Sequence, residues 1–298
     1  MGIFEAAWLG LACLMVQAPV AACLSVDAPA GPATEQIKTG GPEFTGEAVD
    51  VVLSAQAALV WDLTSGDILY QKNANTRRPI ASLSKLLSAL TIRRSLSLDD
   101  EVEISRSVLV AQRMGANISV PVGEHVRVDD LLAASMIASA NDTIVALADA
   151  VAGSEDDFVQ QANVLAPQLG ANNTRLANAT GLTGGEQYST AFDVRRLLTL
   201  AYNDPVLGGY LARAGGTLTT REGTHRSYES TNKLLKTYVP ILAAKTGYTV
   251  EAGENLAIIT QGGSDQKIGA VILGSEDRFQ DMKVLVEWIW RNYSWEKL

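Results

Sequence analysis

The chain has 298 residues, of which 47% are hydrophobic and 19% are charged, and its formal net charge is −9. This composition is typical of a folded globular protein, and the length suffices for one large domain or two small ones. The negative charge, with no run of five basic residues, excludes nucleic acid and anionic membrane surfaces as the expected main partners.

Residues that commonly bind metal ions are few and scattered. The two cysteines, Cys13 and Cys23, lie close to the N-terminus, and the two histidines, His125 and His225, lie far apart in the sequence. The chain after Cys23 therefore has no disulfide framework and no cysteine or histidine metal site. We expect neither a metal ion nor another cofactor.

The first 23 residues resemble an export signal. Residues 6–16 form an apolar run that is too short to span a bilayer, and the small residues 20–22 precede Cys23. This arrangement resembles a bacterial lipoprotein cleavage box, in which Cys23 becomes lipidated, and also an ordinary Ala-x-Ala cleavage site. Two features disagree with an export signal: Glu5 is acidic, and no Lys or Arg precedes the apolar run. The alternative is that the segment is not cleaved and remains as a buried helix. We expect export to the bacterial periplasm or cell envelope, with Cys23 as a possible lipid anchor.

The next segment has the composition of a linker. Residues 24–47 contain three prolines and four glycines and show little apolar periodicity. Such a segment is typical of a flexible spacer between an anchor and a folded domain. The sequence thus predicts a signal segment over residues 1–23, a flexible linker over 24–47 and one catalytic domain over 48–298.

The domain begins with strands and continues with helices. Residues 56–61 predict a strand, and the turn residues at 62–67 lead into a second strand at 68–70. Apolar spacing and N-terminal capping residues then predict helices in the segments 82–90, 129–151, 154–169 and 190–202. Polar residues at 139–142 interrupt the second of these segments, which therefore forms one or two helices.

The C-terminal part returns to strands. Residues 256–260 and 267–273 predict a hairpin through the turn at 262–265, and residues 279–293 predict a closing helix. Strands at both ends of the domain with helices between them favour an α+β fold. We expect one antiparallel sheet assembled from both ends of the domain, flanked by helices, with a helical subdomain inserted.

A serine and a lysine at helical spacing provide the first chemical motif. Ser82 and Lys85 are three residues apart at the start of a predicted helix, so both lie on one face. A serine hydroxyl needs a base to become a nucleophile. A lysine amine can act as that base when burial and a neighbouring positive charge lower its pKa.

Two further motifs follow in order, Ser139-x-Asn141 and Lys245-Thr246-Gly247. Lys245 is a candidate for the second positive charge or for binding an anionic substrate. Each motif alone is weak, because Ser-x-x-Lys occurs four times in this chain and the other two motifs occur twice. Their positions distinguish these copies: the first opens an apolar helix, the second interrupts one, and the third precedes the C-terminal hairpin.

Together the three motifs resemble those of the low-molecular-mass penicillin-binding proteins, the serine-type D-alanyl-D-alanine carboxypeptidases and endopeptidases. The segments 79–81, 178–182, 188–193 and 245–253 add to the resemblance, which covers roughly residues 56–293. The resemblance implies the fold shared by serine β-lactamases and DD-peptidases. It also implies peptidoglycan peptides as substrates and β-lactams as covalent inhibitors.

The resemblance implies catalytic roles for three residues. Ser82 would attack the D-Ala-D-Ala carbonyl and form an acyl-enzyme, Lys85 would be the general base, and Ser139 would relay a proton to the leaving amine. The backbone N–H groups of Ser82 and Tyr248 would form the oxyanion hole.

The remaining motif residues would bind substrate. Asn141 would orient Lys85 and bind the substrate amide, and Lys245 and Thr246 would hold the terminal carboxylate. Gly247 would let the substrate backbone lie close to the strand. Arg278, just before the last helix, matches an arginine that family members often place near that carboxylate.

Two departures from the family pattern bear on the choice of branch. Some members carry an arginine where this chain has Thr231. The larger carboxypeptidases also continue into a β-rich domain and an amphipathic anchor, whereas this sequence stops after the predicted helix 279–293. That shorter form resembles the endopeptidase branch, which cuts peptide crosslinks.

Other classes of function remain as alternatives. A class A β-lactamase shares the fold and motifs but needs a carboxylate to activate the deacylating water, and the segment 172–176 has no acidic residue. A non-catalytic penicillin-binding sensor would not need Lys85. A Ser-His-Asp triad would need His125 or His225, and neither lies near a recognisable nucleophile.

Overall fold

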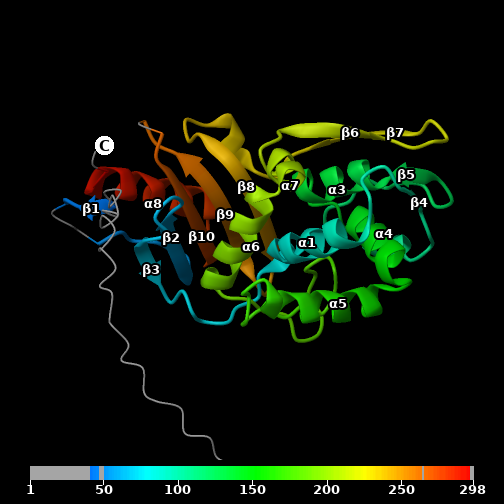
Figure 1. The fold of residues 1–298 in the computed structure, drawn as a ribbon, viewed down its shortest axis with the longest axis horizontal. Helices are drawn as coiled ribbons and strands as arrows, with labels where there is room; N and C mark the ends of the chain where they lie inside the picture. The colour runs from blue at the N-terminus through cyan, green and yellow to red at the C-terminus, as the bar shows by residue number, and fades with distance from the viewer. Residues whose placement is uncertain (1–40, 47–49, 264, 296–298) are drawn as a thin grey trace, which may run out of the picture. The chain divides into compact units, whose positions relative to one another are not determined.

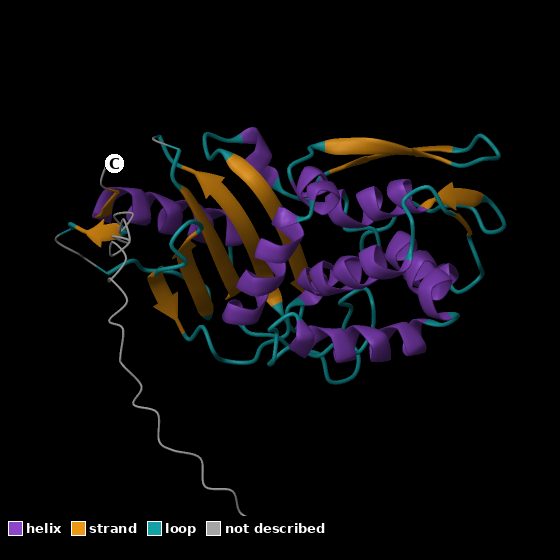
Figure 2. Ribbon diagram, in the orientation of Figure 1, coloured by secondary structure: helices purple, strands orange, loops and turns teal. Residues whose placement is uncertain are grey.

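The computed structural model describes residues 41–46, 50–263 and 265–295, which belong to one unit of the chain. The expected signal segment, Cys23 and most of the expected linker lie outside the described residues. Within the described part, an antiparallel sheet lies beside a group of helices, with helix α8 on the other side of the sheet (Figures 1 and 2).

The main sheet has five antiparallel strands drawn from both ends of the domain. Their order across the sheet is β3-β2-β10-β9-β8. The strands are β2 (Ala57–Asp62), β3 (Ile68–Lys72), β8 (Ile241–Thr249), β9 (Gly253–Gln261) and β10 (Lys267–Ser275). The predicted α+β fold is therefore confirmed, and strand β8, which carries the Lys-Thr-Gly motif, lies at one edge.

The helices cover both faces of the sheet. They are η1 (Ala81–Ser84), α1 (Lys85–Ser95), α2 (Val108–Ala111), α3 (Val128–Ile137), α4 (Asn141–Ala152), α5 (Glu155–Gln168), α6 (Ala191–Asn203), α7 (Pro205–Leu211), η2 (Lys233–Lys236) and α8 (Arg278–Asn292). Helix α8 packs on β9 and β10, whereas α6 packs on the same strands from the other side and also contacts β2.

Strand β2 illustrates why both faces of the sheet are covered. Leu59 and Trp61 point into the core on the α1 side, and Ala58 and Val60 point into the core under α8. Side chains alternate between the two faces of a strand, so a fully apolar strand needs a hydrophobic layer on each face.

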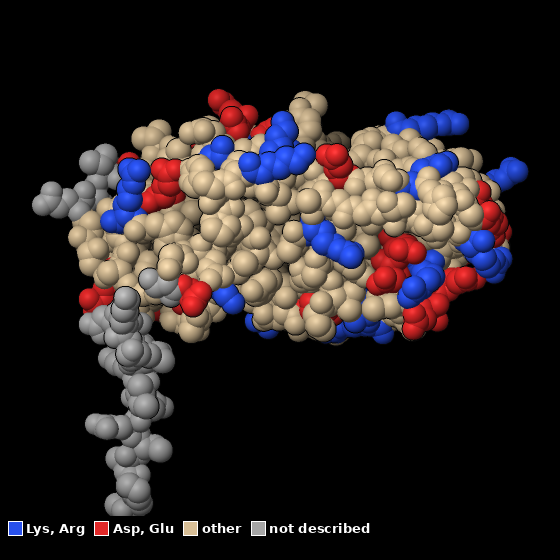
Figure 3. Space-filling model, turned by 90° about the horizontal axis from the view of Figure 1, so that it is seen from above, with Lys and Arg blue, Asp and Glu red and all other residues tan. Residues whose placement is uncertain are grey.

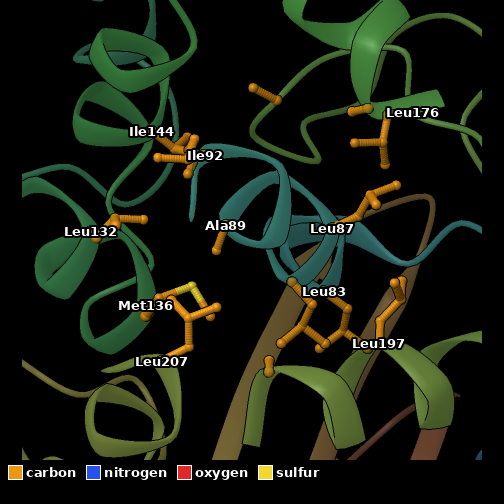
Figure 4. Close-up of a cluster of buried hydrophobic side chains, with 14 of the residues drawn as sticks. Leu83, Leu87, Ala89, Ile92, Leu132, Met136, Ile144, Leu176, Leu197 and Leu207 are labelled. Carbon is orange, nitrogen blue, oxygen red and sulfur yellow. The ribbon is translucent and has the colours of Figure 1, made fainter. Parts of the chain in front are cut away.

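Helix α1 passes through the middle of the helical region. It contacts α3, α4, α5 and α6, and its first eight residues are buried except for the half-buried Leu90. Figure 4 shows Leu87 and Ile92 of α1 among apolar side chains that include Leu132, Met136 and Leu197. Packing against the surrounding helices therefore fixes the first turn of α1, which carries Lys85.

Several predicted boundaries are confirmed by local contacts. The apolar segment 129–151 is split into α3 and α4, and Ser139 lies in the break with a φ of 58°. Ser154 caps α5, accepting a hydrogen bond from the Asp157 N–H at 3.1 Å. The helix predicted at 82–90 begins as the 3-10 turn η1 and becomes an α-helix at Lys85.

The end of the expected linker is corrected by a small sheet. Residues Pro42–Phe44 form β1, which pairs antiparallel with β11 (Tyr293–Trp295). The ring of Phe44 lies edge-on to the ring of Tyr293, with 5.3 Å between their centroids. Aromatic packing therefore joins this short segment to the end of α8, although its prolines and glycines predicted a free spacer.

Two further two-stranded sheets were not expected from the sequence. They pair β4 (Glu101–Glu103) with β5 (His125–Arg127), and β6 (Gly215–Thr219) with β7 (His225–Glu229). Their strands are short and largely polar, so the apolar alternation that indicates a strand is weak.

On the face of the described chain that Figure 3 shows, acidic and basic side chains are interspersed among wide uncharged areas. No helix among the described residues is long and apolar enough to cross a membrane.

Replacement of Gly269 by alanine tests the packing at the centre of the sheet. Gly269 pairs with Trp61 across β10 and β2, and a Cβ at this position would lie 1.9 Å from the indole ring. Because Trp61 is fully buried, Gly269→Ala should lower the free energy of unfolding by about 1–3 kcal/mol in urea titrations. Gly209→Ala, in α7 with open space around it, is the control and should be neutral or slightly stabilising. Equal stability of the two variants would contradict this packing.

Candidate active site

A cavity of about 210 Å³ lies where strand β8 meets the helical region. Seven of the nine site residues predicted from the sequence line it: Ser82, Ser139, Asn141, Thr246, Gly247, Tyr248 and Arg278. The other two, Lys85 and Lys245, are buried behind these residues. Larger cavities occur elsewhere in the described chain, including one of about 510 Å³ beside α8, but none of the nine predicted site residues lines that cavity.

Lys85 is the most constrained side chain of the site. Its Nζ donates hydrogen bonds to Ser82 Oγ at 3.0 Å, Asn141 Oδ1 at 2.7 Å and the Thr180 carbonyl at 2.7 Å. The 3-10 turn leading into α1 places Ser82 one helical turn before Lys85. The three acceptors come from separate parts of the chain, and they fix the amine directly beside the serine hydroxyl.

The pKa of Lys85 is held well below its ordinary value. Burial contributes most, because the charged ammonium loses its hydration, and the positive charge of Lys245 adds to the effect. The carboxylates of Glu155 and Asp142 act in the opposite direction. A lowered pKa makes the neutral amine more accessible, and the neutral amine is the state that a general base requires.

A second lysine lies on the other side of the cavity. Lys245 of β8 donates from Nζ to Ser139 Oγ at 2.7 Å and to the Thr246 carbonyl at 3.1 Å. Burial and the nearby Arg278 guanidinium lower the pKa of Lys245 to about 7. Ser139 Oγ thus accepts a hydrogen bond from Lys245, and the hydroxyl proton of Ser139 remains available for transfer.

Backbone strain is located beside both serines. Ala81, directly before Ser82, has a φ of 47°, and Ser139 itself has a φ of 58°. A non-glycine residue in this region costs about 1–3 kcal/mol and persists only where surrounding contacts hold it. The two conformations direct both hydroxyl groups into the same cavity.

Asn141 is fixed by contacts at both ends of its amide. Its Oδ1 accepts from Lys85, and its Nδ2 donates to the Met114 carbonyl at 2.7 Å. The predicted role in orienting Lys85 therefore has a geometric basis. Gly115, next to Met114, also lines the cavity, and a Cβ there would lie 2.9 Å from Asn141 Nδ2.

The structure adds a second reason for a glycine at position 247. A Cβ on Gly247 would lie 2.7 Å from the Ile80 carbonyl oxygen and 3.1 Å from the Ser82 nitrogen. The strand thus passes directly against the turn that carries the serine. The glycine permits β8 to pack on η1, and close approach by a substrate is not needed to explain it.

The rim of the cavity carries the remaining predicted residues. Arg278, at the start of α8, donates from Nη1 to the Gly247 carbonyl at 2.9 Å, and Tyr248 is 59% exposed. The hydroxyl of Thr246 is hydrogen-bonded to that of Thr231. At the position where some family members have an arginine, this chain therefore has the neutral Thr231, which contacts Thr246.

Three contributors were missed as functional residues. The Thr180 carbonyl accepts from Lys85, and Thr231 lines the cavity. Asp142 accepts from the Ile118 and Val120 N–H groups and so holds the loop on the opposite wall. The carbonyl could not be found from residue type, because every residue has one. Asp142 directly follows the Ser-x-Asn motif, which was the available signal.

The two histidines do not join the site. His125 Nδ1 lies 2.9 Å from Glu222, and His225 Nδ1 lies 3.0 Å from the Thr219 hydroxyl. Neither residue lines the cavity. Within the part of the chain that the structure describes, no group of His, Cys, Asp and Glu is arranged to hold a metal ion.

A serine hydroxyl paired with a buried lysine, at the edge of an antiparallel sheet, has the geometry of a serine-type peptidase with a lysine base. The family model described as D-alanyl-D-alanine carboxypeptidase matches residues 44–277. The chain therefore belongs to the D-alanyl-D-alanine carboxypeptidase family.

Individual relatives carry two activities in their names. The D-alanyl-D-alanine carboxypeptidase DacF of Bacillus subtilis is 32% identical over 77% of this chain, which spans 60% of that protein. The D-alanyl-D-alanine endopeptidase of Pseudomonas aeruginosa is 31% identical over 85% of this chain and 83% of that protein.

Solved structures share the fold. The D-alanyl-D-alanine carboxypeptidase of Mycobacterium tuberculosis aligns over 84% of this chain and 96% of its own, with a TM-score of 0.76 and 25% identity. The Streptomyces K15 DD-transpeptidase aligns over 82% of this chain and 100% of its own, with a TM-score of 0.75 and 25% identity.

Replacement of Gly247 by alanine separates the two explanations for this glycine. Because the added Cβ meets the Ile80 carbonyl, Gly247→Ala should lower the free energy of unfolding of the ligand-free protein by about 1–3 kcal/mol. Displacement of Ser82 should also slow its acylation, on the order of 100-fold. Gly263→Ala, at an exposed site with nothing within 4 Å, is the control. Wild-type stability combined with slow acylation would support the substrate explanation instead.

Proposed function

We propose that this protein is a serine DD-peptidase that acts on the D-Ala-D-Ala end of peptidoglycan stem peptides through an acyl-enzyme on Ser82. One observation carries the proposal. The fully buried Lys85 amine lies 3.0 Å from the Ser82 hydroxyl and is held there by Asn141 and Thr180. A nucleophile and base at this distance are prepared for acyl transfer.

In the acylation step, neutral Lys85 takes the Ser82 proton while Oγ attacks the carbonyl carbon of the penultimate D-Ala. The N–H groups of Ser82 and Tyr248 bind the developing oxyanion. The bond to the terminal D-Ala nitrogen breaks, and Ser139 relays to that leaving amine the proton that Lys85 took from Ser82, so that Ser139 keeps a hydroxyl and Lys85 becomes neutral again. Water then attacks the acyl-enzyme and regenerates the Ser82 hydroxyl with release of the shortened peptide.

The charge of the substrate explains the cations near the cavity. A D-Ala-D-Ala peptide ends in a carboxylate, and Lys245, Thr246 and Arg278 offer positive charge and a hydroxyl donor to it. Asn141 supports the amide of the substrate from the opposite wall. β-Lactams carry a carboxylate and a strained amide, so we expect them to acylate Ser82 covalently.

The alternatives differ in what they require of the chain. A β-lactamase requires a carboxylate at the deacylating water, and the described residues that line the cavity include no acidic side chain. A non-catalytic sensor does not require the contact between Lys85 and Ser82. A DD-endopeptidase uses the same chemistry on a crosslinked peptide, and the relatives named for each activity support both branches.

We extend the proposal to the organisation of the whole chain. The catalytic domain covers residues 48–298, with the added strand at 42–44, and residues 1–23 direct export to the periplasm or cell envelope. Cys23 is the candidate site for a lipid tether, and the residues after it form the spacer. The support for this part is the sequence pattern of the first 47 residues.

Replacement of Ser82 by alanine tests the nucleophile. Ser82→Ala removes only the attacking oxygen, so the variant should lose covalent labelling by a fluorescent penicillin completely while keeping its unfolding midpoint. Labelled protein would be detected after denaturing electrophoresis. Ser294→Ala, in another Ser-x-x-Lys copy, is the matched control and should label like the wild type. Full labelling of the Ser82 variant would refute the assignment.

Digestion of purified peptidoglycan fragments, followed by mass spectrometry, tests the reaction itself. Loss of one alanine from pentapeptide stems, with crosslinked dimers intact, identifies a carboxypeptidase. Conversion of dimers to monomers identifies an endopeptidase. The Ser82→Ala variant is digested in parallel, and the absence of any Ser82-dependent product would favour a wall-sensing protein.

The pH dependence should reflect both lysines. kcat/KM for a D-Ala-D-Ala peptide should rise with pH as Lys85 loses its proton, because the base must be neutral. It should then fall above about pH 7, where Lys245 loses the charge that binds the substrate carboxylate. Lys245→Arg keeps its charge at all these pH values, so its falling limb should disappear even if its activity is lower. An identical falling limb in that variant would assign the decline to another group.

A further inference from the structure

Glu155 is an acidic residue that contacts the 178–182 loop, in which the Thr180 carbonyl accepts a hydrogen bond from Lys85. It is the first residue of α5, directly after the capping residue Ser154, and is partly buried. Its Oε1 accepts a hydrogen bond from the Ala179 N–H at 2.8 Å. Glu155 does not line the cavity, so it is not placed to activate a water molecule there.

The Ala179 amide belongs to a short segment that is held on several sides. The Ala179 carbonyl accepts from Ser88 Oγ at 2.9 Å, and the next carbonyl, that of Thr180, accepts from Lys85 Nζ at 2.7 Å. The following residue, Gly181, has a φ of 84°, and a Cβ there would lie 2.1 Å from the Ala81 carbonyl oxygen. The bond from Glu155 therefore fixes the 178–179 peptide, and Ser88 fixes the next peptide, which leads directly to the one that carries the Thr180 carbonyl.

Three charged groups act on Lys85, each from a different element. Lys245 on β8 favours the neutral amine, whereas Asp142 on α4 and Glu155 on α5 favour the ammonium. Asp142 already accepts two backbone hydrogen bonds from the opposite loop. The pKa of Glu155 is raised, mainly by its burial, which is the expected result for a carboxylate held against a loop.

We propose that Glu155 is a positioning residue for acylation, which fixes the Thr180 carbonyl against Lys85 and supplies a negative charge on the far side of that loop. The inference rests on the proposed function, since it concerns the same base. The Glu155 side chain has two effects. Its hydrogen bond sets the position of Lys85, and its negative charge makes the Lys85 ammonium harder to deprotonate.

Two substitutions distinguish these effects. Glu155→Gln keeps an oxygen that can accept from Ala179 but removes the charge. Its acylation rate at the pH optimum should stay within about threefold of the wild type, while the rising limb of the pH profile moves to lower pH by several tenths of a unit. Glu155→Ala also removes the acceptor, and its rate at the pH optimum should fall on the order of 10- to 100-fold. Asp156→Asn, an exposed neighbour on the same helical turn, is the charge-matched control and should leave the limb in place.

The measurement is the second-order rate constant for labelling by a fluorescent penicillin between pH 5 and about pH 10, the range in which a perturbed lysine titrates. Titration of the Lys85 side chain by NMR, with the signal assigned through Lys85→Arg, gives the same shift without turnover. A rising limb and a Lys85 titration that are unchanged in Glu155→Gln would overturn the inference. A wild-type protein that shows no Ser82-dependent labelling would refute the proposed function instead, because the inference concerns only the position and slope of a reaction that occurs.

Discussion

The burial of one lysine amine is the constraint on which the site depends. Lys85 is buried without a carboxylate hydrogen-bonded to it, and its three acceptors are a hydroxyl, an amide oxygen and a backbone carbonyl. Each acceptor comes from a separate segment, so η1, the start of α4 and the 178–182 loop must all meet at this point. The stability of the packed helices around α1 compensates for the desolvation of this polar group.

The fold was largely predictable from the sequence because its signals were strong. Apolar strands at both ends of the domain, a capped helix after Ser154 and polar residues at 139–142 each predicted the element that the structure contains. The hairpin at residues 215–229 and the pairing of Pro42–Phe44 were not predictable. Their stability comes from tertiary contacts and aromatic packing, and local periodicity carries little information about either.

The motifs also predicted which side chains the structure brings together, but not the physical reasons for all of them. Gly247 was interpreted as space for a substrate, and the structure adds that an alanine there would meet the Ile80 carbonyl in the turn before Ser82. The Thr180 carbonyl and Glu155 act through hydrogen bonds to the backbone and through charge. Such contributions depend on the folded path of the 178–182 loop, which residue types alone do not reveal.

The sheet topology has a consequence for when the nucleophile becomes reactive. Strand β2 pairs with β10, which lies about two hundred residues later in the chain, and Lys245 lies on β8, which is followed by β9 and then β10. Such non-local pairing forms late and slowly in folding. In an unfolded or partly synthesised chain, Lys85 is hydrated and has an ordinary lysine pKa, so it stays protonated and Ser82 is inert. The long-range pairing of the sheet therefore delays the reactivity of the serine until the C-terminal strands have been added.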